Sequence, residues 1–144
     1  MSTTTPNTTA NVSARKPRIL VVEDDQFMLK AHEIKFTHEG FDIWFAKDGD
    51  EALAFLARER PDVVLLDLML PHTSGFDVLA AIRKHPVWKN VPVIVMTNLG
   101  QPQDVERAKL LGANDYLIKA NTKISDVVKK VREYLQMEEN IAQH

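Results

Sequence analysis

The chain has 144 residues, a net charge of −2 at neutral pH, 44% hydrophobic side chains and no cysteine. This length allows one domain with a real hydrophobic core. The absence of cysteine excludes disulfides and thiolate chemistry and is compatible with a cytoplasmic location. The charge argues against non-specific nucleic-acid binding, and no apolar run approaches the length of a membrane span.

The first 17 residues, MSTTTPNTTANVSARKP, are rich in Thr and Asn and lack the basic and apolar regions of a signal peptide. We expect a disordered arm over residues 1–17. A single domain is expected over 18–137, followed by a frayed tail over 138–144. We find no internal repeat and no second domain.

After Pro17, short apolar runs predict five strands, at 18–22, 41–46, 62–67, 91–97 and 114–119. A helix is predicted after each strand. Phe27, Ala31 and Ile34 recur at helical spacing in the first helix, and Gly40 marks its end. Five β–α units whose strands are apolar on both faces predict an α/β fold with a parallel sheet covered on both sides.

Local signals support the remaining helices. Asp48 and Glu51 have the spacing of a capping box at the start of the second helix, and Gly112 ends the fourth. The last helix carries one apolar stripe, formed by Ile124, Val127, Val128, Val131 and Leu135.

Four of the five apolar runs end in polar side chains. These are Glu23-Asp24-Asp25 after the first run, Asp67 after the third, Thr97-Asn98 after the fourth and Lys119 after the fifth. Ligands of open α/β sheets bind outside the carboxyl ends of the strands, so we expect these side chains to meet there. Asp67, in the run VVLLDLML, is therefore expected to emerge at the edge of the sheet.

Three converging carboxylates cannot all stay ionised without a compensating cation. Lys119 supplies one positive charge, and Mg²⁺ held by carboxylates and water would supply the rest. Carboxylates, an ammonium group, a hydroxyl and Mg²⁺ together suit phosphoryl transfer. A carboxylate can itself be the nucleophile, which gives an aspartyl phosphate.

The ordered set of motifs resembles the receiver domain of bacterial two-component response regulators, in particular stand-alone chemotaxis-type receivers. The motifs are VVEDD, LLDLMLPHTSGFDVL, VIVMTNL and GANDYLIKA, and the similarity runs from about Arg18 to Leu135. The family has a flavodoxin-like doubly wound sheet of five parallel strands, in the order 2-1-3-4-5, flanked by five helices. The resemblance implies the same fold here.

The resemblance also implies a role for each site residue. Asp67 would be the phospho-acceptor, and Thr97 and Lys119 would contact the phosphoryl group. Mg²⁺ would be bound by Asp24 directly, by Glu23 through water, by Asp67 and by the backbone carbonyl of Met69. Tyr116 matches the family's switch aromatic, although a plainly packed tyrosine is an equal alternative.

The sequence departs from the family pattern around two of these residues. Ala120 stands where a proline usually follows the lysine, often after a cis peptide, so we expect a trans peptide or local strain. Asn98, after Thr97, is larger than usual and is expected to narrow access. Met69 and Leu99 cannot orient an attacking water, which leads to the hypothesis of a long-lived phosphoryl group.

The implied function is a phosphorylation-dependent signalling switch rather than an enzyme. Its partners would be a histidine kinase or histidine phosphotransfer protein and a downstream protein that binds the face of the fourth helix, fifth strand and last helix. No nucleic acid or membrane is expected to bind, and the chain would be a monomer or a phosphorylation-dependent homodimer. Alternatives are a pseudo-receiver that is not phosphorylated and a Mg²⁺-dependent phosphatase, although DLM lacks the second Asp of that class.

Other polar residues have simpler interpretations. Asp25 is expected to cap the first helix, and Trp44 and Trp88 to pack in the core. The basic side chains of the last helix indicate a solvated face or a partner surface. The histidines are expected at the surface; they are His32, His38, His72, His85 and His144.

Overall fold

The computed structural model describes residues 15–143, with side chains up to Gln136. Residues 1–14, which make up most of the expected arm, and His144 lie outside the described part. The division into an arm, a domain over 18–137 and a tail stays a prediction. At the start of the described chain, Arg15 forms an ion pair of 3.1 Å with Asp62.

Five strands form one parallel sheet in the order β2-β1-β3-β4-β5. They are β1 (Arg18–Val22), β2 (Asp42–Ala46), β3 (Val63–Leu66), β4 (Val93–Thr97) and β5 (Asp115–Ile118). Every residue of β3 and β4 is buried, as strands covered on both faces require. The predicted strand order, 2-1-3-4-5, is confirmed.

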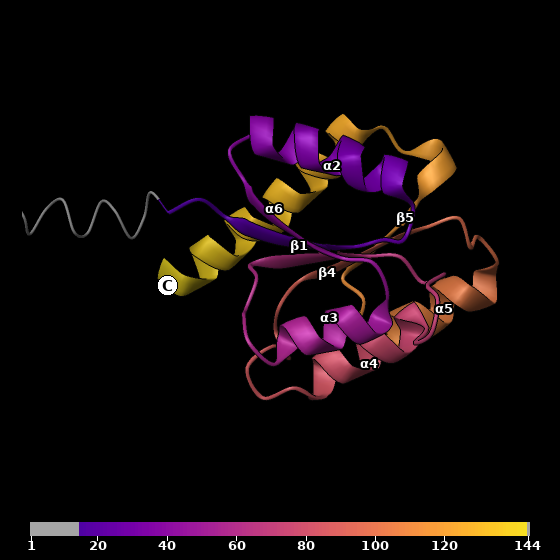
Figure 1. The fold of residues 1–144 in the computed structure, drawn as a ribbon. Coiled ribbons are helices and arrows are strands. Elements are labelled where there is room, and N and C mark those ends of the chain that lie inside the picture. The colour runs from indigo at the N-terminus through magenta and orange to yellow at the C-terminus, as the bar shows by residue number, and fades with distance from the viewer. Residues whose placement is uncertain (1–14, 144) are drawn as a thin grey trace, which may run out of the picture.

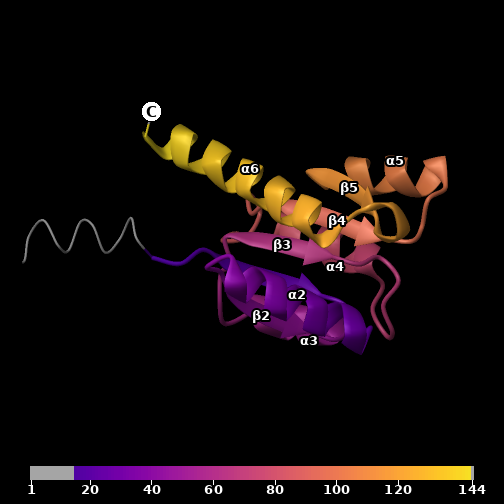
Figure 2. The ribbon, with the colours of Figure 1, turned by 90° about the horizontal axis from the view of Figure 1, so that it is seen from above.

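Helices cover both faces of the sheet (Figure 1), with α2 and α6 on one side and α3, α4 and α5 on the other. They are α2 (Gln26–His38), α3 (Gly49–Leu56), α4 (Gly75–Lys84), α5 (Pro102–Leu110) and α6 (Ile124–Gln143), and a 3₁₀ turn, η1 (Lys119–Asn121), precedes α6. The turned view shows the end of α6 reaching past the sheet (Figure 2).

The predicted helix caps are present. Asp25 accepts from the backbone N–H groups of Phe27 and Met28 at the start of α2. Asp48 accepts from the Glu51 N–H at 2.8 Å at the start of α3, and the Glu51 carboxylate reaches back to the Lys47 N–H, one residue before the position that a standard capping box uses. After α2 and α5 the chain turns at Gly40 (φ +90°) and Gly112 (φ +104°), in the left-handed region that glycine tolerates.

The buried face of α2 differs from the apolar stripe seen in the sequence. Leu29, His32 and Phe36 pack against the sheet, whereas Phe27 is 89% and Ile34 61% exposed. Leu29, His32 and Phe36 therefore form the buried face of α2. Phe27 and Ile34, which set the apolar spacing seen in the sequence, lie on the opposite, solvent-exposed face. The helix is therefore confirmed, but its apolar stripe faces outward and forms an exposed apolar surface.

The expectation of surface histidines is wrong for His32, which is 1% exposed. Its ring stacks on Phe36 with centroids 6.1 Å apart, and Nδ1 donates to the Met28 carbonyl at 2.7 Å. This intrahelical bond and the aromatic contact let an imidazole take an apolar position. His38 and His72 are exposed, and Trp88 is buried as expected.

Candidate functional site

The sheet register brings the carboxylates together. Val22 and Leu66, the last residues of β1 and β3, are partners in the ladder, and the Asp67 N–H donates to the Val22 carbonyl at 3.0 Å. Glu23 and Asp67 therefore leave the sheet side by side at its carboxyl edge. The short apolar strands thus position the acids before any side-chain contact is considered.

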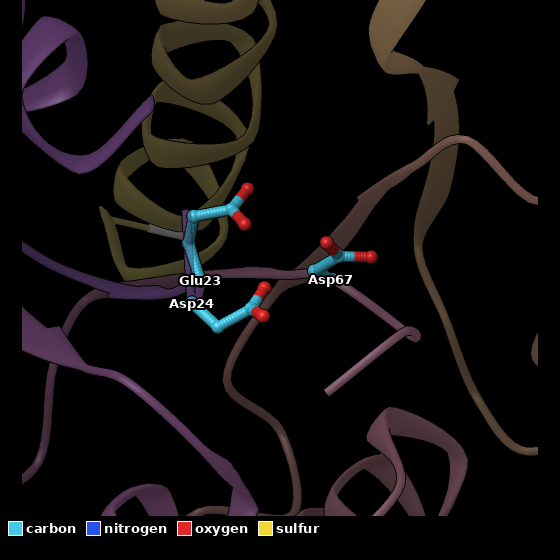
Figure 3. Close-up of side chains that lie close together, drawn as sticks. All are labelled: Glu23, Asp24 and Asp67. Carbon is cyan, nitrogen blue, oxygen red and sulfur yellow. The ribbon is translucent and has the colours of Figure 1, made fainter. Parts of the chain in front are cut away.

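Glu23, Asp24 and Asp67 form a compact acidic cluster (Figure 3), with one carboxylate oxygen from each lying within 4.8 Å of the others. Asp24 is exposed, but Glu23 is only 3% and Asp67 only 4% exposed. Asp67 lies at the predicted edge, yet the expectation that it emerges there is corrected, because its side chain is buried. Burial of an ionised carboxylate requires a charged partner.

Lys119 is that partner. Its ammonium lies 2.6 Å from Asp67 Oδ2 and 2.5 Å from Glu23 Oε1. Burial by itself would lower the pKa of Lys119, but hydrogen bonds and attraction to the two carboxylates outweigh it and raise the pKa. Burial raises the pKa of Glu23 in spite of its bond to Lys119. One ammonium against three carboxyl groups leaves the cluster without enough positive charge to balance three ionised acids.

The cluster suits a hard divalent cation. With all three acids ionised, one lysine leaves two negative charges uncompensated, and Mg²⁺ prefers a few carboxylates plus water. Opposite ligands of Mg²⁺ lie about 4.2 Å apart, given metal–oxygen distances of about 2.1 Å. The oxygens lie within 4.8 Å of one another, which is close to this and compatible with the expected direct ligation by Asp24 and Asp67 and the expected contact of Glu23 through water.

The loop after Asp67 folds back over the site. The Met69 N–H donates to Asp67 Oδ1 at 3.0 Å, which places Met69 next to the acid as expected, whereas the use of its carbonyl as a metal ligand stays a prediction. The Gly75 N–H donates to the Leu68 carbonyl at 3.1 Å. A Cβ on Gly75 would overlap with the Asp67 carbonyl oxygen, so glycine is required where α4 begins.

Thr97 and Lys119 come from neighbouring strands. Thr97 is the last residue of β4 and is partnered with Ile118, the last residue of β5. Thr97 therefore lies beside the residue that directly precedes Lys119. Thr97 is fully buried, and its Oγ1 accepts from the Leu99 N–H at 3.4 Å. The predicted site residues are therefore brought to one edge, although their individual roles are not tested by this geometry.

Tyr116 is half-buried, and its hydroxyl donates to the Leu99 carbonyl at 2.5 Å. The N–H of Leu99 also donates to the Thr97 hydroxyl, so Tyr116 is connected to Thr97 through the loop that follows β4. This arrangement accommodates both the switch and the packing interpretation of Tyr116. Burial raises the pKa of its phenol, which keeps the donor protonated.

The two departures from the family pattern lie next to each other. The Ala120 N–H donates to Asn98 Oδ1 at 3.2 Å. The described residues contain no cis peptide, which agrees with the expected trans bond before Ala120. Nothing in the sequence links Asn98 to Ala120, because a contact between residues 22 positions apart leaves no pattern in a single sequence.

The doubly wound parallel sheet, with an acidic cluster and a lysine at its carboxyl edge, defines the chain as a flavodoxin-like α/β domain whose ligand site lies at that edge. The particular family follows from comparison with known proteins. The chain belongs to the response regulator receiver domain family, whose model matches residues 19–132. It is thus a receiver domain of two-component signal transduction, with an acidic cluster consistent with a phosphorylation site.

Curated relatives are longer proteins. The chain is 35% identical over 127 residues to the "DNA-binding dual master transcriptional regulator RpaA" of Synechocystis, covering 88% of this chain and 52% of the relative. It is 38% identical over 102 residues to "Response regulator PleD" of Caulobacter vibrioides, covering 71% of this chain and 22% of that protein. The chain therefore spans about half the length of the first relative and less than a quarter of the second.

Solved structures agree with the fold. A CheY-like receiver domain protein from Methanospirillum hungatei superposes with a TM-score of 0.82 at 25% identity, covering 88% of this chain and 98% of the other. The receiver domain of the Francisella response regulator 1452 gives 0.79 at 29% identity, with coverages of 85% and 99%. Within residues 15–143, no helix combines the length and apolarity needed to cross a bilayer.

Proposed function

We propose that this receiver domain is a signalling switch that takes a phosphoryl group onto Asp67 from a phosphohistidine donor, with Mg²⁺ bound. The observation that carries the proposal is the placement of Asp67, which is buried beside two further acids and paired with Lys119 at 2.6 Å. A site that only capped a helix would need neither the lysine nor the acids.

In the proposed transfer, an Asp67 carboxylate oxygen attacks the phosphorus of the donor. An O–P bond forms as the P–N bond to the donor imidazole breaks, and the electron pair leaves with the imidazole nitrogen. Lys119, already within hydrogen-bond distance of Asp67, neutralises the charge on the phosphoryl oxygens. Bound Mg²⁺ would be held by Asp24 and Asp67 directly and by Glu23 through water, and it would compensate the remaining negative charge.

The phosphoryl donor is proposed to be a histidine kinase or a histidine phosphotransfer protein, because receiver domains partner with such proteins. A protein donor must contact the surface around Asp24. The exposed side of α2 begins three residues further on, where Phe27 (89% exposed), Ala31 and Ile34 form an apolar stripe, named here the α2 stripe. Exposed apolar patches of this kind mark interaction sites.

The output is proposed to be binding of a downstream protein on the face of α5, β5 and α6. A shallow groove runs between α5 and β5, lined in part by Val105, Lys109, Tyr116 and Ile118. Phosphorylation would draw Thr97 toward Asp67, and Tyr116 is the groove residue joined to the same loop through Leu99. A local charge change could thereby alter a remote surface.

The alternatives are a receiver that is never phosphorylated and a phosphatase with turnover. The acids and the lysine remain in contact, which favours phosphorylation over the first. Leu68 and Met69 follow Asp67, so the second Asp of the phosphatase pattern is missing. A long-lived phosphoryl group, a cytoplasmic location and the absence of DNA binding by this segment stay predictions.

The test is incubation with acetyl phosphate and Mg²⁺, followed by intact-mass measurement of the wild type and of Asp67→Ala. One added phosphoryl group on the wild type and none on the variant would support the proposal. No modification of the wild type would indicate a receiver that is not phosphorylated, and continuous release of phosphate at an enzyme-like rate would indicate a phosphatase. Asp62→Ala, remote from the site at the start of β3, is the matched control.

A further inference from the structure

The loops that follow Thr97 and Lys119 are joined by one side chain. Asn98 Oδ1, directly after Thr97, accepts from the Ala120 N–H, directly after Lys119, at 3.2 Å. We name this hydrogen bond the strap. It requires an acceptor at position 98 and a residue other than proline at position 120, since proline has no backbone N–H. This chain has both departures together.

The strap acts on the turn that carries Lys119. Residues 119–121 form the 3₁₀ turn η1, which Thr122 closes by donating through its hydroxyl to the Ile118 carbonyl at 2.8 Å. The Ala120 N–H donates to the Asn98 side chain, so Asn98 holds the residue directly after Lys119. The strap therefore fixes the middle of this turn, one residue after the backbone position from which the Lys119 side chain leaves.

The position of Lys119 matters because one ammonium serves two acids. It lies 2.5 Å from Glu23 and 2.6 Å from Asp67, and a shift of about 1 Å would break one of these contacts, given the range of hydrogen-bond lengths. Small displacements of a group that contacts the reacting atoms are costly in rate.

We propose that Asn98 is a positioning residue, which acts through the strap to hold Lys119 between Glu23 and Asp67 for phosphoryl transfer. This inference rests on the proposed function of Asp67. It replaces the earlier expectation that Asn98 matters by its size, through narrower access to the site. The two ideas predict opposite effects when the side chain is shortened, so they can be separated.

The test compares Asn98→Ala, Asn98→Leu and Ala120→Pro, with Asn121→Ala as the matched control on the same turn. The rate of Asp67 phosphorylation by acetyl phosphate is measured with Mg²⁺ at saturation. Loss of one hydrogen bond between neutral groups predicts a rate about 3- to 10-fold lower in the first three variants, and little change in Asn121→Ala. A faster Asn98→Ala with an unchanged Asn98→Leu would overturn the proposal and favour size.

The double variant Asn98→Ala/Ala120→Pro isolates the strap. Because Ala120→Pro already removes the donor, Asn98→Ala should have no further effect in that background, and additive effects would overturn the proposal. If Ala120→Pro does not fold, Asn98→Leu, which keeps the size of the side chain and loses the acceptor, still tests it.

A spectroscopic measurement tests the strap without relying on the proposed function. The ¹⁵N signal of the Lys119 ammonium, assigned with Lys119→Arg, should shift in Asn98→Ala and Asn98→Leu and stay in place in Asn121→Ala. An unchanged signal in all variants would overturn the positioning role. If these shifts occur in the Asn98 variants but the wild type is never phosphorylated, the result would instead contradict the assignment of Asp67.

Discussion

The imidazole of His32 is a titratable group on the otherwise apolar buried face of α2. His32 is almost completely buried, Nδ1 donates to Met28, and Nε2 has no hydrogen-bond partner within the described part of the chain. Burial lowers the pKa of His32, and the charge of Lys119 lowers it further, against the raising effect of the Met28 carbonyl. The folded protein therefore holds His32 neutral.

This predicts acid sensitivity. Since the pKa is lower in the folded than in the unfolded state, the unfolded chain takes up a proton first as the pH falls below about 6.5. The stability contributed by neutral His32 is fully present above that pH and is lost progressively below it. The free energy of unfolding of the wild type should fall between about pH 7 and 5, as measured by urea denaturation.

The variant His32→Leu should have a weaker pH dependence over the same interval, because the titrating group is gone. Its stability at low pH should equal or exceed that of the wild type, since a buried atom without a partner is removed. The control is His38→Gln, an exposed position on the same helix. An undiminished pH dependence in His32→Leu would show that other groups cause it.

At the scale of elements, α2 shows which parts of the fold the sequence could predict. The order of strands and helices was accessible because apolar runs, capping residues such as Asp48, and glycines such as Gly40 are local signals. The orientation of α2 was not, because both of its sides carry apolar residues. The choice was made by tertiary packing of Leu29 and Phe36, with Phe27 left outside.

The site divides in the same way. The acids and Lys119 were predictable, because strand ends of a parallel sheet meet at one edge. The burial of Asp67 and the bond between Asn98 and Ala120 were not, since both depend on how loops fold over the edge. Likewise, a lone arginine in the sequence does not reveal that Arg83 donates to the carbonyls of Val91 and Gly112, between α4 and the strands.

The α2 stripe leads to a prediction about donor recognition. Replacing Phe27 and Ile34 with serine removes apolar area that a protein donor would bury, which predicts phosphotransfer from a cognate phosphorylated donor slowed by about tenfold or more. Phosphorylation by acetyl phosphate, which needs no docking surface, should stay within about twofold, and stability should change little at exposed positions.

The matched control for the α2 stripe is Val87→Ser. Val87 is 58% exposed but follows α4, near the start of β4 and therefore at the opposite edge of the sheet from Asp67. Equal losses for the two donors in Phe27→Ser/Ile34→Ser would mean that the site itself had been damaged. Unchanged transfer from the protein donor would place its docking surface elsewhere.

At the scale of the whole molecule, the acidic cluster that the proposed function needs is expected to lower the stability of the fold. Folding brings carboxylate oxygens of Glu23, Asp24 and Asp67 to within 4.8 Å of one another. Within residues 15–136 a single ammonium, that of Lys119, pairs with this cluster, and it contacts only Glu23 and Asp67, so it cannot compensate three like charges. Repulsion within this acidic cluster lowers the stability of the metal-free protein. A cation that binds the folded and not the unfolded chain should restore it through linkage.

The final prediction follows from this linkage. Mg²⁺ at about 100 times its dissociation constant should stabilise the wild type by about 2.7 kcal/mol, measured as an increase in the thermal midpoint. Asp24→Asn removes one of the repelling charges and a metal ligand together. It should therefore melt higher than the wild type without Mg²⁺ and gain little when Mg²⁺ is added.

Asp126→Asn separates this effect from a general change in net charge, since Asp126 is an exposed acid in the first turn of α6. It should respond to Mg²⁺ as the wild type does. If Asp24→Asn melts lower than the wild type in the absence of metal, the carboxylate is a net stabiliser and the cluster is not under repulsion. If it keeps the full response to Mg²⁺, the cation binds elsewhere, and the compensation argued for Asp67 must come from Lys119 alone.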